Sequence, residues 1–118
     1  MDPIGEFLLT LLHGVTNTHI LHWLETDYGK HKTLGKFYEK LQDATDELAE
    51  AIMGCYDMKP QFPQTYYHPA ENGEHELMAL KDYVEKNRVN LPQDSAIQTL
   101  VDNVMTQIDR ALFLIRLR

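Results

Sequence analysis

The chain has 118 residues, which is the usual size of one compact domain with a single hydrophobic core. Its 43% hydrophobic and 25% charged residues are typical of a soluble globular protein, and no apolar run reaches the roughly 18 residues that a membrane-spanning helix needs. The net charge of −7 opposes tight binding to phosphate backbones, so nucleic acid is not an expected partner and no membrane association is expected.

The first predicted helix covers residues 3–26. Asp2 and Pro3 are typical of an N-cap and a first helical residue. Apolar residues then recur at helical spacing on one face: Phe7, Leu11 and Val15. Other apolar residues fall well round the cylinder from that face: Leu9, Ile20 and Leu24. We therefore expect this helix to pack on two sides, against its own bundle and against something else.

Three further helices are predicted, at residues 31–57, 74–89 and 94–117. The turn 27–30 precedes the second helix, and its core stripe includes Leu41, Leu48 and Cys55. Residues 59–73 are too rich in proline for a helix interior and form a long connection. Asp94 is the expected N-cap of the last helix. The sequence predicts one all-α domain, 1–118, folded as a four-helix bundle.

Cys55 is the single cysteine of the chain, so it cannot form an internal disulfide. Its place in the apolar stripe predicts a buried thiol. A lone core thiol suits a reducing compartment, and no cleavable leader is recognisable at the start of the chain. We therefore expect a cytoplasmic protein.

Possible metal ligands are concentrated in one stretch of the sequence. Its histidines and acids are His19, His22, His31, Asp43, Asp46, Glu47 and Glu50. Imidazole and carboxylate are ligands of iron and of other divalent first-row metals. Asp46 and Glu50 are four residues apart on a helix, so both carboxylates can reach one ion. His19 and His22 are three residues apart, so their rings can also reach one ion.

The direction of these side chains indicates a site shared between subunits. The stripe of Leu41 and Leu48 places Asp46 and Glu50 on nearly the opposite side of their helix, away from their own core. His22 lies on the apolar face of the first helix, where a neutral metal ligand is favoured over a cation. If one ion takes both sets, the carboxylates come from one chain and the histidines from another. The simpler interpretation is a solvated acidic face and a hydrogen-bonded core histidine.

Several familiar motifs are missing. No Glu-x-x-His pair occurs, which disfavours a di-iron centre inside the bundle, and no His-Glu-x-x-His, Walker-type loop or Cys-x-x-Cys occurs either.

The region from His22 to Glu50 resembles the signature of the Dps mini-ferritins, a family of the ferritin-like superfamily. The family pattern is His-Trp, a loop, a His that opens the second helix with a Phe six residues on, and Asp-x-x-Ala-Glu. The chain has these elements in order: His22-Trp23, His31 with Phe37, and Asp46 to Glu50. The loop between the two histidines is shorter than usual by roughly one helical turn.

The resemblance implies a ferritin-like bundle that binds and oxidises iron. His22 and His31 would be ferroxidase ligands of one subunit, and Asp46 and Glu50 would come from its two-fold partner, with Trp23 beside the site. The family oxidises Fe²⁺ with hydrogen peroxide or oxygen, stores ferric mineral in a twelve-subunit shell and so protects against oxidative damage. We expect the same function and a homo-oligomer.

One departure from the family bears on the metal site. Gly35 stands where the family usually has an acidic ligand, and His19 could partly replace it, being one turn before His22. Two alternatives therefore stay open. The chain is either a Dps-like bundle with a degraded single-metal or vestigial site that serves metal binding or protein interaction, or a helical interaction protein in which the pattern of His and acids is a coincidence.

Overall fold

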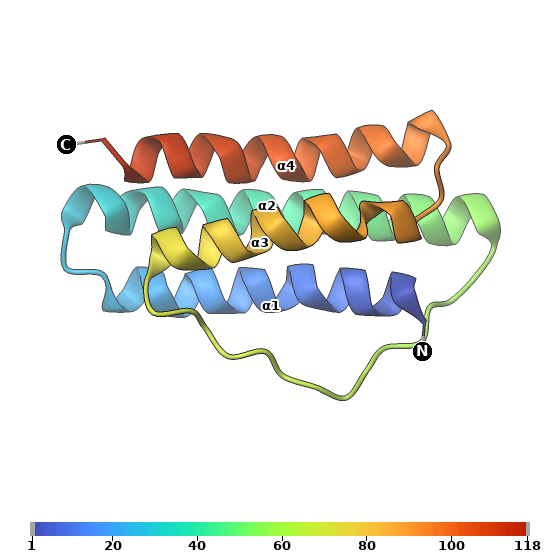
Figure 1. Cartoon of the computed structure of the whole chain (residues 1–118), viewed down its shortest axis with the longest axis horizontal. Helices are drawn as coiled ribbons and strands as arrows, with labels where there is room; N and C mark the ends of the chain where they lie inside the picture. Colours follow the sequence, from blue (N-terminus) through green and yellow to red (C-terminus); the bar gives the residue numbers. More distant parts are fainter. Residues whose placement is uncertain (1, 118) are drawn as a thin grey trace.

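The computed structural model describes residues 2–117, and across them the chain forms four α-helices and one short 3-10 helix (Figure 1). The elements are α1 (Pro3–Leu24), α2 (Tyr28–Tyr56), α3 (Gly73–Asn87), η1 (Arg88–Asn90) and α4 (Ser95–Ile115). The prediction of an all-α four-helix bundle is confirmed for these residues. The predicted bounds differ by a few residues, and α2 begins earlier than expected because the Asp27 side chain caps its first turn.

The helices form two antiparallel pairs joined by one long segment. A short turn joins α1 to α2, and η1 leads from α3 into α4, whereas residues 57–72 run the length of the bundle between the end of α2 and the start of α3 (Figure 1). As a result α2 and α3 point in the same direction. Each helix packs against two others: α1 and α4 both contact α2 and α3.

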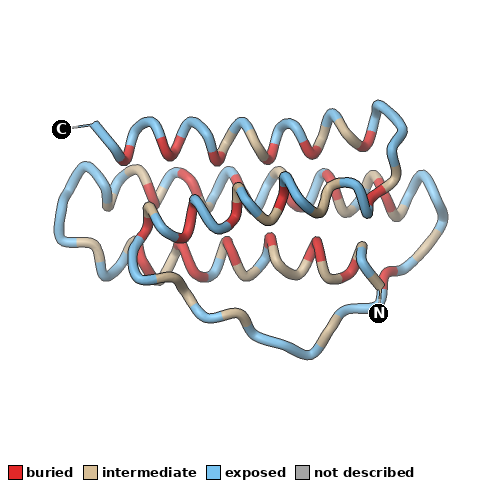
Figure 2. The backbone as a smooth tube through the Cα atoms, viewed as in Figure 1, coloured by how far each residue is buried: buried red, intermediate tan, exposed pale blue. Residues whose placement is uncertain are grey.

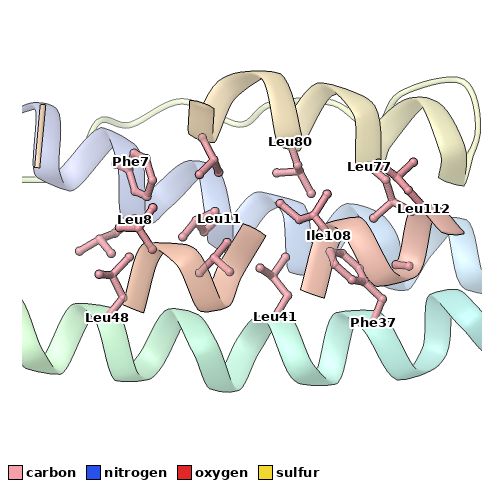
Figure 3. Close-up of a cluster of buried hydrophobic side chains, with 14 of the residues drawn as sticks. Phe7, Leu8, Leu11, Phe37, Leu41, Leu48, Leu77, Leu80, Ile108 and Leu112 are labelled. Atoms are coloured by element: carbon pink, nitrogen blue, oxygen red, sulfur yellow. The ribbon is translucent and has the colours of Figure 1, made fainter. Parts of the chain in front are cut away.

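The core fills the space between the four helices, and buried residues line the inward side of each (Figure 2). Leucine and isoleucine dominate it, with Phe7 and Phe37 at different levels of the bundle (Figure 3). Leu41 and Leu48, predicted as the core stripe of α2, are fully buried. Such burial is worth about 1.5–3 kcal/mol for each large apolar side chain.

The long connection lies directly against α1. A Cβ atom at Gly5 would fall 1.7 Å from the carbonyl oxygen of Gln61, so only glycine allows the backbone of residue 61 to pass this close. Asp2 reinforces the contact, because its carboxylate caps α1 and also accepts a hydrogen bond from Gln61 N (2.9 Å).

One prediction about an individual residue is wrong, and another is confirmed for the position of the residue but not for its capping bond. Cys55 is exposed, because α2 extends beyond the helices that cover its core face and its last buried residue is Ile52 (Figure 1). Asp94 stands at the N-cap position of α4 but makes no capping bond with its side chain. Its carboxylate instead accepts a hydrogen bond from Tyr56 (2.6 Å), which raises the pKa of that phenol to about 12.

Part of the apolar surface of α1 stays outside the core, as the sequence indicates. Leu24 and Trp23 are exposed by 69% and 66%, and Leu9 and Ile20 are only half-buried. No helix in the described part of the chain combines the length and the apolar character needed to cross a membrane.

Candidate functional site

The candidate site lies at the end of the bundle where α1 ends and α2 begins. Only residues 25–27 join the two helices. The Glu25 carboxylate accepts hydrogen bonds from the two backbone N–H groups that follow it, and Asp27 caps α2. This closely bonded turn sets His22, in the last turn of α1, against His31, in the first turn of α2.

His22 and His31 hold each other through reciprocal hydrogen bonds, an arrangement called here the histidine clasp. Nδ1 of each ring donates to the backbone carbonyl oxygen of the other residue, at 2.6 Å in both cases. The rings are stacked, with centroids 3.8 Å apart and planes 17° apart. Because a carbonyl oxygen can only accept, Nδ1 of each ring must carry a proton. In the neutral imidazole Nε2 then has the free lone pair. Metal-binding histidines are commonly oriented by a hydrogen bond of this kind, made by the ring nitrogen that does not bind the metal.

The clasp also has a structural role. The His22 carbonyl is one of the last four of α1, which have no partner within the helix. The His31 ring satisfies it. The two histidines therefore close the α1–α2 hairpin whether or not a metal binds, and His22 is half-buried in this seam rather than enclosed in the apolar core.

Gly35 leaves the space that the His22 ring occupies. A Cβ atom at residue 35 would lie 2.8 Å from His22 Cε1, closer than real Cβ contacts come, so any side chain here would displace the imidazole. The two rings and Gly35 line a surface pocket of about 280 Å³. The other residues of its lining are Tyr28, Lys32, Lys36, Tyr38 and Glu39.

His19 lies next to the clasp but is engaged elsewhere. Its ring stacks on Tyr38, with centroids 4.0 Å apart and planes 13° apart, and it packs on Trp23 at 4.6 Å. The centroid of the His22 ring is 6.3 Å away. Tyr38 is not among the site residues that the sequence predicts. Its position seven residues after His31, on the same side of α2, is the sequence signal that could have placed it beside the site.

The two carboxylates lie on the exposed face of α2, away from the clasp. Asp46 and Glu50 are both exposed, as the stripe of Leu41 and Leu48 predicts. At about 1.5 Å per residue they are roughly 22 and 28 Å along the helix from His31. Within residues 2–117 of one chain, no three histidine, cysteine, aspartate or glutamate side chains come together as a metal site. One chain therefore supplies two neighbouring imidazoles in one place and two carboxylates in another.

Comparison with known proteins places the chain in a family. Residues 22–115 match DUF5856, which is described as a family of unknown function. The chain is a member of DUF5856. No curated protein matches it, and neither does any solved structure.

The part of this DUF5856 protein that matches the family starts at His22. It contains both residues of the clasp, Gly35 and the two carboxylates, whereas His19 and most of α1 lie before it.

Proposed function

We propose that this DUF5856 protein is a ferritin-like, Dps-type iron protein that oxidises Fe²⁺ at sites shared between two copies and stores the ferric product. The observation that carries the proposal is the histidine clasp, because it fixes two neighbouring imidazoles in the tautomer with Nε2 free.

The connectivity of the bundle supports a ferritin-like assignment. Ferritin-like folds have one long crossover connection, whereas simple up-down bundles have only short loops. Residues 57–72 are such a crossover, and they make α2 and α3 point in the same direction (Figure 1).

The charges on α2 favour pairing with a second copy of the chain. An antiparallel, two-fold arrangement of α2 with α2 can bring His31 between Asp46 and Glu50 of the second copy. That register places lysines of one copy opposite acids of the other: Lys32 with Glu47, Lys36 with Asp43, and Lys40 with Glu39. Complementary charges of this kind select partner and register more than they add affinity.

Exposed apolar side chains beside the clasp give the same pairing a hydrophobic component. Trp23 and Leu24 at the end of α1 are 66% and 69% exposed, and Tyr28 at the start of α2 is also exposed. Contiguous apolar surface rimmed by polar groups marks protein interfaces. In the proposed assembly these residues are buried at the two-fold interface, and dimers could assemble further into a twelve-subunit shell.

Each shared site would combine His22 and His31 of one copy with Asp46 and Glu50 of the other. Two neutral imidazoles and two carboxylates suit Fe²⁺, and the carboxylates neutralise its charge. Two Fe²⁺ ions each lose one electron to one molecule of hydrogen peroxide, which takes up two protons and leaves as two water molecules. The Fe³⁺ formed hydrolyses to mineral, so that both peroxide and free Fe²⁺ are removed. The net charge of −7 favours attraction of Fe²⁺.

Gly35 favours one alternative within the same assembly, a single-metal site that binds a divalent first-row ion without ferroxidase activity. The family's acidic ligand at this position is missing, and a side chain there would collide with His22. His19 is stacked on Tyr38, so recruiting it as a replacement ligand would cost that contact.

Mixing two inactive variants tests whether the site is shared. One variant lacks the histidines (His22→Ala with His31→Ala) and the other lacks the acids (Asp46→Ala with Glu50→Ala). In a heterodimer of the two, one site has all four residues and the other has none. We expect each variant alone to be inactive in the ferric absorbance that follows anaerobic Fe²⁺ loading and peroxide addition, and the purified heterodimer to recover about half of the wild-type sites.

A matched control removes an acid that is exposed but not part of the site. Glu85→Gln on α3 should leave iron oxidation unchanged. If the heterodimer recovers nothing while wild type is active, the sites are not shared. If wild type remains a monomer in light scattering and binds no Fe²⁺, the proposed function is wrong. Titration of iron per chain separates two metals per site from one.

A further inference from the structure

A second site lies on the other side of α1, away from the histidine clasp. Here α1, α3 and the long connection line a cavity of about 300 Å³ that is open to the surface. Cavities that bind small ligands start at about this size. The floor is carbon-rich and includes Gly14, Ala70 and Leu80, while polar groups come from His13 and Glu76.

The wall that the connection contributes is fixed by hydrogen bonds to both helices. Asn17 of α1 donates to the carbonyl oxygen of Tyr67 (2.9 Å) and accepts from the Tyr66 hydroxyl (2.9 Å). The backbone N–H of Tyr67 donates to His13 Nδ1 (3.3 Å), and that of Ala70 donates to Glu76 Oε1 (2.8 Å). Because these bonds hold an otherwise irregular segment in place, the cavity is preformed rather than a gap between mobile parts.

Glu76 is the unusual residue of this cavity. It is a glutamate with only 7% of its surface exposed, in the first turns of α3, and burial raises the pKa of its carboxyl group. Glutamate is almost never buried without a charged partner. The Ala70 N–H and the Asn17 side chain both hydrogen-bond to this carboxylate. No cation neutralises it, since none of the described residues that line the cavity is lysine or arginine.

The other titratable groups around Glu76 do not supply a cation either. Burial lowers the pKa of His13, and its Nδ1 accepts a hydrogen bond, so the ring is held neutral. Glu6 on α1 adds a second carboxylate to the lining, and His68 on the connection lies at the exposed side. The cavity is therefore apolar in its body and electronegative at its polar end.

We propose that this cavity binds a small organic cation, an ammonium or amidinium compound with a compact apolar body, whose charged group pairs with Glu76. The carbon-rich walls hold the apolar body, and the Glu76 carboxylate, which no cation among the residues lining the cavity neutralises, provides the charge-assisted hydrogen bond. The proposal does not depend on the iron site, because the residues of the two sites lie on different sides of α1.

The alternative is that Glu76 serves only to anchor the connection through Ala70. Phenethylammonium, with 2-phenylethanol and phenylacetate as matched neutral and anionic probes, separates the two. Each is titrated into ¹⁵N-labelled full-length protein, and backbone amide shifts are followed. We expect phenethylammonium to shift the amides of Gly14, Ala70 and Ala79, and to bind at least tenfold more tightly than the alcohol.

Two variants and one control make the test specific. Glu76→Gln keeps an oxygen for the Ala70 N–H and should weaken phenethylammonium binding about tenfold, while Glu85→Gln on the exposed side of α3 should not change it. Ala79→Phe, at an exposed position of the lining, should block phenethylammonium binding without altering the core. This variant tests the location of the binding site even if Glu76→Gln does not fold. The proposal is overturned if no lining amide shifts, if the alcohol binds equally well, or if binding survives both variants.

Discussion

Gly35→Ala tests the account of the histidine clasp directly. Alanine is the better residue in a helix interior, by about 1 kcal/mol. At residue 35, however, the added Cβ would lie 2.8 Å from Cε1 and 3.1 Å from Nδ1 of His22. The ring is at the end of a side chain and can swing away, but doing so breaks its hydrogen bond to the His31 carbonyl and its stacking on the His31 ring.

The magnitude follows from these two losses. A hydrogen bond of this kind contributes about 1 kcal/mol and a stacked ring pair about 1 kcal/mol, against a gain of about 1 kcal/mol from helix propensity. Gly35→Ala should therefore lower the free energy of unfolding by about 1 kcal/mol. Gly54 is a matched control in the same helix, because a Cβ there meets no atom within 4 Å. Gly54→Ala should therefore raise the free energy of unfolding by up to about 1 kcal/mol.

Urea denaturation of both variants measures the difference of about 2 kcal/mol, which corresponds to roughly 1 M between their midpoints. The Cε1–H proton signal of His22 should also move in Gly35→Ala and stay in place in Gly54→Ala. Equal stabilisation by the two substitutions, with an unmoved His22 signal, would refute the claim that glycine is needed to seat the imidazole.

Three further measurements test the fold. Leu41→Ala, at a fully buried position of α2, should cost about 3 kcal/mol in chemical denaturation, and a loss under 1 kcal/mol would argue against the described packing. Asp57 ends α2 in the left-handed region (φ 47°), so Asp57→Gly should raise the free energy of unfolding by up to about 1 kcal/mol, and destabilisation would contradict this. The pKa of Glu76 is raised above its unfolded value of 4.5, so its contribution to stability is complete below about pH 4.5 and is lost as pH rises through the folded pKa. Glu76→Gln should thus gain stability relative to wild type as pH rises above about 4.5, and a stability difference independent of pH would contradict the raised pKa of Glu76.

Local signals predict much of the bundle because the helices are set by short-range chemistry. Asp2 and Pro3 start α1 as their residue types indicate, and Leu41 and Leu48 are buried at the spacing of a core stripe. Cys55 continues that spacing and is nevertheless exposed. Periodicity reports which side of a helix is apolar, but whether a partner helix reaches that far depends on the relative lengths and offsets of all four helices.

The exposure of the two carboxylates could be predicted from the sequence, whereas the geometry of the histidine clasp could not. The exposure of Asp46 and Glu50 follows from the position of the apolar stripe on α2. The clasp does not follow from any side-chain pattern, since it depends on where a three-residue turn places two backbone carbonyls. The cavity at Glu76 could not be predicted from the sequence either, because one of its walls is an irregular segment held by long-range hydrogen bonds.

The clasp also changes the meaning of Gly35. From the family pattern alone, glycine at this position counts as the loss of an acidic ligand. In the structure the same glycine is what allows the His22 ring to stack on His31 and donate to its carbonyl. Restoring the acid by Gly35→Asp would therefore add a ligand and displace one at the same time. The iron site proposed above therefore has to be built around the two fixed imidazoles, with the carboxylates supplied by α2 of a second copy.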